Sequence, residues 1–380
     1  MIVWSLAAAY IALLLIKCVL AIRASAQPTA VGPSADLSRL AIAQPILSGD
    51  PALEHTLDAN VRALEGAHVI WLVDEDDPLG IDICERLIQR HPSARIDIVQ
   101  VPIASPGVNP KLFKLERARA VAGDRIFVVL DDDARLPEGS AAQLMHALGA
   151  SDLSTALPAY TDDGRWPSRL LAQFVNNNAA LTYLPLLNVM PPITINGMAY
   201  AMSAETLTAL GGFEPIQRAL TDDLAVARRV IETGRRIHQT AAPVWVSTTV
   251  TDGRHYMRQM HRWYLFALLL VQRQPIGMQM LITLLNASPA LLLWSCIVAT
   301  AMTWAVVGVV PLAALVVIRA GGLMWLQQRI YGRHVHRPFT SLVSELLQPV
   351  HLLHALCRRT IVWRTRRYRV IDSDRFEVAE

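Results

Sequence analysis

Cysteine is scarce in this chain, with four residues among 380: Cys18, Cys84, Cys296 and Cys357. No two of them share a spacing that is typical of a metal site or a redox pair, and two lie within apolar runs. This pattern argues against a disulfide framework. It fits a domain that lies in the reducing cytoplasm.

Charge is also sparse, because only 18% of the residues are charged and 53% are hydrophobic. An ordinary soluble domain carries about 25% charged residues. From Gln274 to Ile318 there is no Asp, Glu, Lys or Arg, a stretch long enough for about two membrane spans of 20 residues each. We therefore predict two transmembrane helices within 273–330, near 281–302 and 305–326. We predict no nucleic-acid partner.

The first 22 residues form another apolar segment, in which only Lys17 carries a charge. A cleaved signal peptide is one interpretation. However, no basic residue precedes the apolar stretch, and Lys17 and Arg23 lie at its end, which favours an uncleaved anchor. The positive-inside rule then places the following domain in the cytoplasm, on an inner or plasma membrane. Residues 23–38 contain Pro28, Gly32 and Pro33 and are predicted to be a linker.

The last 50 residues, 331–380, contain a third apolar segment at 341–357 and then a basic tail. If that segment spanned the bilayer, the tail would lie outside, against the positive-inside rule. We therefore predict an interfacial or re-entrant helix followed by a basic cytoplasmic tail. The tail is either solvated or bound to an anionic leaflet. Its arginines are Arg358, Arg359, Arg364, Arg366, Arg367 and Arg369.

Between the apolar ends, residues 39–272 alternate short apolar runs with helical patterns, which predicts an α/β, doubly wound parallel sheet. In such sheets ligands bind at the carboxyl ends of the strands. The expected strands are 40–43, 68–73, 96–101 and 126–130, and the expected helices are 52–64, 81–90 and 112–121.

Acidic clusters follow two of these strands. Asp74 comes after the second, and Asp131 with Asp133 after the fourth. Two carboxylates one residue apart on a turn can converge on a hard cation such as Mg²⁺ or Mn²⁺, shared with substrate phosphates. The alternative is an acidic loop that caps the next helix.

A third acidic pair, Asp222 and Asp223, opens a helical pattern that runs to about Thr233, with Thr221 as its expected N-cap. The helix dipole would keep Asp223 ionised, as a general base requires. The plainer interpretation is that both aspartates only stabilise the helix N-terminus.

Gln259, Arg262 and Trp263 are spaced at i, i+3 and i+4 and therefore share one helix face. An arginine there suits phosphate oxygens, and a tryptophan suits a sugar or an acceptor. An amphipathic helix at the membrane surface would show the same pattern.

Together these residues resemble the D, D, D, (Q/R)xxRW set of inverting GT-A glycosyltransferases. Further segments resemble the ceramide glucosyltransferase-like group and the related hopanoid-biosynthesis glycosyltransferases. Asp76-Asp77-Pro78 with the following residues is similar to "DDPAIDVC", and Gly107-Val108-Asn109-Pro110-Lys111 to "GINPK". The stretch 360–369 is similar to the "TISWRTGRYR" tail.

The resemblance covers about residues 40 to 370 and implies a role for each matched position. It implies Asp223 as the catalytic base and Asp131 and Asp133 as ligands of Mg²⁺ or Mn²⁺. It implies that donor and acceptor are bound by Asp74, Asp76, Asn109, Lys111, Asp132, Asp222, Gln259, Arg262 and Trp263.

Three departures from the family pattern concern the substrate. Residues 44–49 lack the lysines of the family's "KPLKG", the second motif is three aspartates in a row, and 176–178 is an Asn run with no aligned counterpart. We predict transfer of a hexose-type sugar from a UDP-sugar to a lipid hydroxyl, ceramide-like or hopanoid, with inversion. The alternatives are a processive polysaccharide synthase, which needs a channel, and a non-catalytic UDP-sugar-binding scaffold.

Overall fold

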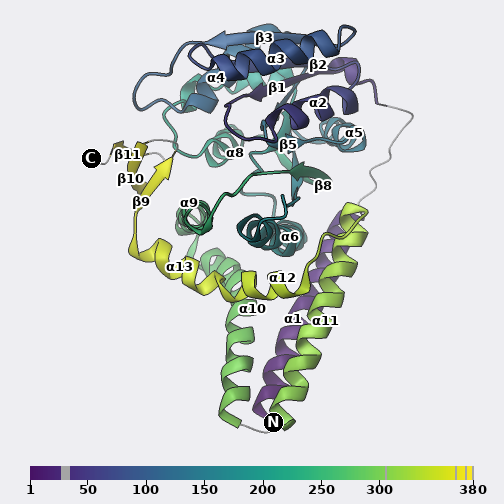
Figure 1. Cartoon of the computed structure of the whole chain (residues 1–380), viewed down its shortest axis with the longest axis vertical. Helices are drawn as coiled ribbons and strands as arrows, with labels where there is room; N and C mark the ends of the chain where they lie inside the picture. The colour runs from purple at the N-terminus through teal and green to yellow at the C-terminus, as the bar shows by residue number, and fades with distance from the viewer. Residues whose placement is uncertain (27–34, 304–305, 364–365, 373–374, 379–380) are drawn as a thin grey trace.

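The computed structural model describes residues 1–26, 35–303, 306–363, 366–372 and 375–378. A rounded α/β domain stands on a bundle of long helices, with two short helices lying across the junction (Figure 1). Residues 27–34, half of the predicted linker 23–38, lie outside the described residues, as do residue 305 of the second predicted C-terminal span and Arg364 of the basic tail.

The domain is built on an eight-stranded sheet of order β3-β2-β1-β4-β7-β6-β8-β5. The four predicted strands are present and pair in parallel. The sheet is mixed rather than wholly parallel, because β7 runs antiparallel to both β4 and β6. The bounds are β1 (Leu40–Pro45), β2 (His68–Asp74), β3 (Arg95–Val101), β4 (Ile126–Leu130), β5 (Ala134–Arg135), β6 (Leu153–Tyr160), β7 (Ala199–Met202) and β8 (Ile237–Val246).

The reversal of β7 follows from the path of the chain. Strand β6 ends at Tyr160, and the chain then forms a long helix. It re-enters the sheet at Ala199, at the same end of the strands, without first crossing to their amino ends. The start of β7 therefore lies beside the end of β4, where the Asp131 amide donates to the Met198 carbonyl oxygen at 3.0 Å. This brings the loop before β7 to the edge where ligands bind.

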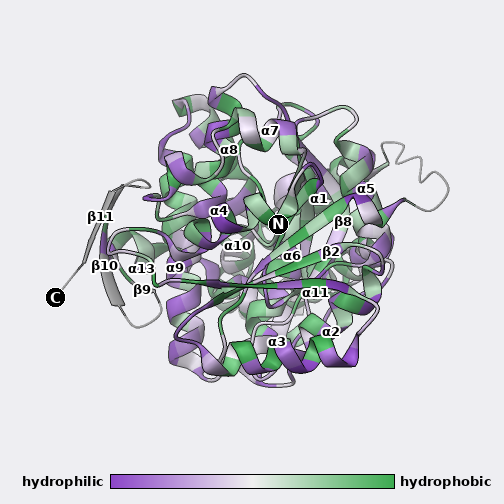
Figure 2. Ribbon diagram, turned by 90° about the horizontal axis from the view of Figure 1, so that it is seen from above, coloured by the Kyte–Doolittle hydropathy of each residue, from purple (hydrophilic) through white to green (hydrophobic). Residues whose placement is uncertain are grey.

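Helices cover the two faces of this sheet, and hydrophilic residues lie on their outer sides around a hydrophobic middle (Figure 2). The core includes Trp71, which is fully buried and whose indole donates to Gln44 Oε1 at 3.2 Å. Gln44 stands in the stretch that departs from the family pattern. The helices are α2 (Leu53–Ala63), α3 (Pro78–Arg90), α4 (Pro110–Ala122), α5 (Glu138–Ala147), α7 (Ala204–Ala209) and α8 (Asp222–Glu232).

Three helices are long and apolar enough to cross a membrane: α1 (Ile2–Ser25), α10 (Ile276–Thr303) and, within α11 (Val306–Tyr331), residues Gly308–Tyr331. A helix of 24 residues is about 36 Å long, which exceeds the roughly 30 Å hydrocarbon core. The short helices α12 (Pro338–Leu346) and α13 (Gln348–Cys357) are only about 15 Å long each. They lie where the long helices meet the catalytic domain (Figure 1).

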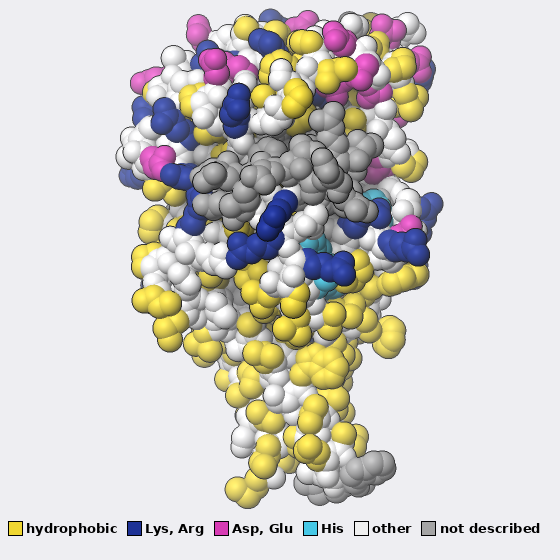
Figure 3. Space-filling view, turned by 90° about the vertical axis from the view of Figure 1, so that its left-hand side faces the viewer, with side chains coloured by type: hydrophobic (Ala, Val, Ile, Leu, Met, Phe, Trp, Pro, Cys, Tyr) yellow, Lys and Arg dark blue, Asp and Glu magenta, His cyan; other side chains and the backbone are white. Residues whose placement is uncertain are grey.

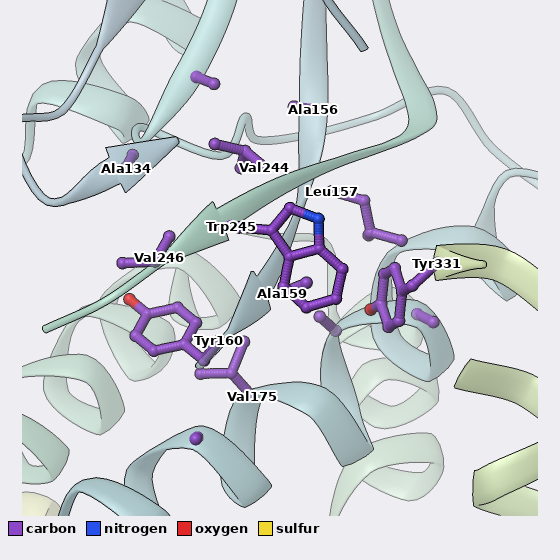
Figure 4. Close-up of a cluster of buried hydrophobic side chains, with 14 of the residues drawn as sticks. Ala134, Ala156, Leu157, Ala159, Tyr160, Val175, Val244, Trp245, Val246 and Tyr331 are labelled. Atoms are coloured by element: carbon purple, nitrogen blue, oxygen red, sulfur yellow. The ribbon is translucent and has the colours of Figure 1, made fainter. Parts of the chain in front are cut away.

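Two helices lie between the sheet and this junction, α6 (Trp166–Leu186) and α9 (Gly253–Gln272) (Figure 1). One hydrophobic cluster runs from α1 through α6 to β6 and β8. Part of it surrounds Trp245 of β8, whose ring meets that of Tyr331 in α11 edge-on at 6.0 Å (Figure 4). The long helices and the sheet therefore share one core and form a single packed body.

Lys17 does not snorkel to an interface from its helix end. Its side chain is 5% exposed and Nζ donates to the Leu285 carbonyl oxygen of α10 at 2.9 Å. The physical reason lies four residues further along α10, at Pro289. Proline has no N–H, so the Leu285 carbonyl has no partner within its own helix. Lys17 supplies the missing donor from α1.

This contact predicts a specific pair of stability effects. Lys17→Met should lower the free energy of unfolding in detergent by about 1–3 kcal/mol, because it leaves a buried carbonyl without a donor. In a Pro289→Ala background the alanine N–H satisfies Leu285, so the same Lys17→Met change should cost far less. Equal costs of Lys17→Met in both backgrounds, measured by reversible unfolding, would contradict the assignment.

Candidate active site

The candidate site lies at the carboxyl edge of the sheet, on the side that faces α6 and α9. Here the turn after β4 meets the loop before β7 and the N-termini of α4 and α8. Lys111 contacts both Asp131 and Asp222, and Arg262 of α9 is close enough for the charges of these aspartates to act on it. Residues from four separate parts of the sequence thus meet in one place.

Lys111 joins the second and third acidic motifs. Its Nζ lies 2.7 Å from Asp131 Oδ1 and 2.6 Å from Asp222 Oδ2, and it donates to the Gly197 carbonyl oxygen at 3.0 Å. Burial alone would lower the pKa of Lys111, but the two carboxylates raise that pKa well above its ordinary value. Lys111 therefore remains a cation among the aspartates.

Asn109 holds this lysine in place. Its Oδ1 accepts from the Lys111 and Leu112 amides, which caps α4, and its Nδ2 donates to the Ala219 carbonyl oxygen at 3.1 Å. The side chain is almost fully buried. The resemblance groups Asn109 with the donor-binding residues. Because its amide is occupied within the protein, we assign it to positioning α4 and the loop before α8.

The acidic residues that follow β2 lie in two different environments. Asp74 ends β2 and pairs with Lys114 at 2.9 Å, and Lys114 also donates to the Ile46 carbonyl oxygen at 2.7 Å. Lys114 is 1% exposed and stands one helical turn after Lys111. Asp76, in contrast, is exposed on the turn that follows β2. Asp74 is thus held rigidly, whereas Asp76 is open to a ligand.

The three consecutive aspartates after β4 point to different partners. Asp132 Oδ2 accepts from the Leu47 amide at 2.8 Å and ties this turn to the loop after β1. Asp133 Oδ2 accepts from the Thr248 hydroxyl at 2.6 Å. Burial and the charge of Asp133 raise the pKa of Asp132 to about 7, while burial and the charge of Asp131 raise that of Asp133 to about 6.

Asp131 and Asp133 are the residues predicted to bind a divalent cation. Burial raises the pKa of Asp131, and the charge of Lys111 beside it acts in the opposite direction. Among the described residues, no three His, Cys, Asp or Glu side chains are arranged to hold a metal ion. Two carboxylates that leave the remaining positions to water and phosphate oxygens are typical of Mg²⁺ bound together with a nucleotide.

Asp223 stands in the first turn of α8 and is half-buried beside Asp222. Thr221 occupies the N-cap position as predicted, but its side chain makes no capping hydrogen bond. Burial and the neighbouring charge of Asp222 raise the pKa of Asp223 to about 7. The sequence argument that the helix dipole keeps Asp223 ionised is therefore outweighed. A carboxylate with this pKa is well matched to accept a proton near neutral pH.

Helix α9 closes the site from the membrane side. Arg262 Nη2 donates to Gln259 Oε1 at 3.0 Å, so these residues lie on one face as their spacing predicts. Trp263 stacks on Phe174 of α6, with ring centroids 6.2 Å apart, and meets Tyr160 edge-on at 6.0 Å. The arginine thus faces the acidic cluster, while the tryptophan belongs to an aromatic wall.

Three residues at the site escape the sequence patterns. Tyr160 ends β6, a strand that the apolar runs do not predict, and the charges of Asp133 and Asp131 act on its hydroxyl. Thr248 follows β8 and holds Asp133. Tyr183 of α6 lies near Asp223, and burial together with that charge raises the pKa of Tyr183 to about 12. For Tyr160 and Thr248, the one feature of the sequence that could have indicated a place in the site is their position at or just after the end of a strand.

The mixed sheet and the site at its carboxyl edge define a glycosyltransferase of the GT-A fold that uses a nucleotide-sugar donor. The profile of Glycosyl transferase family 21 matches residues 2–376. The chain belongs to this family, which is ceramide glucosyltransferase-like, and it is a glycosyltransferase. The predicted family and fold class are confirmed. A search of curated proteins finds no match.

One solved structure supports the fold, and two others are similar at a lower level. A mannosyltransferase from Pyrobaculum calidifontis, solved with GDP-mannose and Mn²⁺, is 17% identical, with a TM-score of 0.51 over 91% of this chain and 98% of its own. Staphylococcus aureus TarS 1–349 with UDP-GlcNAc is 9% identical, with a TM-score of 0.37 over 90% and 99%. A mycobacterial protein is 18% identical, also at 0.37, over 68% and 84%.

The pKa of Asp223 leads to a prediction for the pH profile. A base must be deprotonated to act, so kcat/KM should be level above about pH 7 and fall as the pH drops below it. Asp222→Asn removes the neighbouring negative charge, so the acidic limb should move to lower pH, alongside a loss of rate.

The matched control is Asp124→Asn, at the opposite edge of the sheet before β4, which should leave the position of the limb unchanged. An acidic limb that stays in place in Asp222→Asn would show that a group other than Asp223 controls the profile.

Proposed function

We propose that this chain transfers a hexose-type sugar from a UDP-sugar to the hydroxyl of a membrane lipid, with inversion at the anomeric carbon. The acceptor is ceramide-like, and a hopanoid is the second candidate. The product is a glycolipid. The catalytic domain faces the cytoplasm, as the positive charges after the first apolar segment indicate.

The observation that carries this proposal is where the site lies relative to the long apolar helices. The aromatic wall beside the acidic cluster includes Phe174 of α6. Further along, α6 contacts two candidate spans, through Thr182 to Asn286 of α10 at 3.0 Å and through Asn188, just beyond its end, to the Leu20 carbonyl of α1 at 3.1 Å. A lipid headgroup at the bilayer surface therefore meets the site through α6, and its tail can stay in the membrane.

In the proposed reaction Asp223 takes the proton of the acceptor hydroxyl, and that oxygen attacks the anomeric carbon as the bond to UDP breaks. Asp222 keeps the pKa of this base near neutrality, after the larger effect of burial. Trp263 and Tyr183 flank the acceptor side. Each of these groups then either contacts the reacting atoms or acts on a residue that does.

On the donor side, Arg262 and Lys111 supply fixed positive charge to the departing diphosphate. Asp74 and Asp76 take the uridine side, with Asp132 holding the turn between them and the metal ligands. Asp131 and Asp133 would hold Mg²⁺ or Mn²⁺, which neutralises charge on a leaving diphosphate. The Mn²⁺ and GDP-mannose in the Pyrobaculum mannosyltransferase support such an ion for this fold.

A processive polysaccharide synthase is the main rival, because it shares the Gln-x-x-Arg-Trp motif. It requires a transmembrane channel for its polymer. The structure describes three helices that are long enough to span, and α1 packs directly against both α10 and α11. This close packing favours an acceptor that stays in the bilayer over a polymer that crosses it.

The proposal predicts the fate of two variants in a host that lacks glycolipids. Asp223→Asn should lower kcat about 10²–10⁴-fold, because the general base is lost. Glu232 lies at the far end of the same helix and forms an ion pair with Arg228. Glu232→Gln should therefore keep wild-type turnover. Ceramide or a hopanoid polyol is supplied with a panel of UDP-sugars, and lipid extracts are measured by mass spectrometry.

A new hexosyl, hexuronosyl or N-acetylhexosaminyl lipid that is absent from Asp223→Asn would name the donor and acceptor together. A long water-soluble polymer would overturn the lipid acceptor. UDP binding with neither transfer nor donor hydrolysis would indicate a scaffold instead of an enzyme of this reaction.

A further inference from the structure

One side of the molecule gathers arginines immediately above the apolar lower half (Figure 3). They come from α9, from the end of α13 and from β10 of the C-terminal sheet. All are exposed, and the antiparallel register places Glu377 of β11 opposite Arg369. We call this the arginine face, and it consists of Arg254, Arg258, Arg358, Arg359 and Arg369.

The C-terminal part of this face is a small sheet of β9 (Thr360–Trp363), β10 (Arg366–Asp372) and β11 (Arg375–Val378). Arg369 pairs with Thr360 in the antiparallel register, and the Val370 amide donates to the Arg359 carbonyl oxygen at 2.8 Å. Arg358, Arg359 and Arg369 are therefore neighbours, although ten residues or more separate the last from the others in the sequence.

The face is joined firmly to α9. The ring centroids of His261 in α9 and His354 in α13 are 4.5 Å apart, and His261 Nε2 lies 3.0 Å from the Thr360 carbonyl oxygen. On the next turn back, the Tyr256 hydroxyl hydrogen bonds with His351 at 2.9 Å. The arginines of α9 and of the C-terminal segment are therefore held by elements that pack directly against each other.

An apolar strip borders the arginine face. Helix α13 ends directly before Arg358 and exposes Val350, Leu353 and Leu356, with exposed fractions of 49%, 61% and 54%. Their spacing of three residues puts them on one side of the helix. Exposed apolar side chains beside a group of exposed arginines are typical of a segment that lies on an anionic lipid surface.

The inner side of the same small sheet packs against the catalytic machinery. Ile361 of β9 and Val370 of β10 are each 1% exposed and form one cluster with Leu220 and with Leu265 and Leu269 of α9. Leu220 lies two residues before Asp222. The C-terminal sheet thus supports the loop that carries the acidic pair and the helix that carries Arg262.

We propose that the arginine face binds the phosphate headgroups of anionic lipids, and that this docking presses the C-terminal sheet against Leu220 and so positions the loop of Asp222 and Asp223. The headgroup is a ligand of this face and not the acceptor of the reaction. The positioning half rests on the proposed function of Asp223, whereas the docking half does not.

The test uses the full chain reconstituted in nanodiscs of phosphatidylcholine, with or without phosphatidylglycerol. Anionic lipids retained on the protein are counted by native mass spectrometry, and kcat and KM of transfer are measured in parallel. An arginine near an anionic surface strengthens binding about fivefold, with screening by salt. Wild-type protein should retain phosphatidylglycerol and gain several-fold in kcat at low salt.

Arg358→Gln/Arg359→Gln/Arg369→Gln should retain far less phosphatidylglycerol and show one kcat in both nanodiscs, equal to that of the wild type without anionic lipid. The matched control, Arg86→Gln/Arg90→Gln/Arg95→Gln on α3 and β3, makes the same charge change at the far end of the domain and should behave as wild type. Equal retention by both triple variants would overturn the docking.

Ile361→Ala separates the two halves of the proposal. It should retain phosphatidylglycerol normally but lose the gain in kcat with KM unchanged, and Ile361→Val should recover most of that gain. Normal retention without any gain in wild-type kcat would overturn the positioning half. Absence of transfer with normal, arginine-dependent retention would count against the proposed function alone and leave the docking established.

Discussion

The contact of Lys111 with two aspartates is the interaction on which the rest of the site depends. At an effective dielectric near 20, two like charges 4 Å apart repel by about 4 kcal/mol. The second and third acidic motifs approach each other because one ammonium lies 2.7 Å from Asp131 and 2.6 Å from Asp222. Asn109 fixes that ammonium by capping α4 and binding the chain before α8. The spacing between the proposed base and the proposed metal ligands therefore follows from one helix N-terminus.

A second constraint comes from burying polar groups where the long helices meet the domain. Arg319 of α11 donates to Glu345 of α12 at 2.6 Å and to Ser341 Oγ at 2.9 Å, and Tyr10 of α1 donates to the same glutamate at 2.8 Å. A buried ion pair is tolerated only when its hydrogen bonds are filled. Ser341 also accepts from Asn177 of α6 at 2.8 Å. This network fixes how the long helices sit under the site.

Local patterns in the sequence predicted the four parallel strands, the three helices between them and the acidic residues at their ends, because alternation and apolar runs report burial directly. The reversed strand β7 was not predicted, since four apolar residues carry no direction. The inward-facing Lys17 was missed because its partner is a carbonyl freed by Pro289, far along the chain. The raised pKa of Asp223 was missed for a similar reason, since burial is a property of the assembled site.

The bond between Lys17 and Leu285 also bears on how the chain is made. Its two ends are separated by 268 positions, and the Tyr10–Glu345 bond by 335. Because synthesis runs from the N-terminus, α1 leaves the ribosome long before any of its partners exist. The Lys17 side chain therefore has no Leu285 partner while the α/β domain is being translated. Assembly is completed only when the last helices arrive, so a prematurely terminated chain leaves the polar groups of its first helix without their partners.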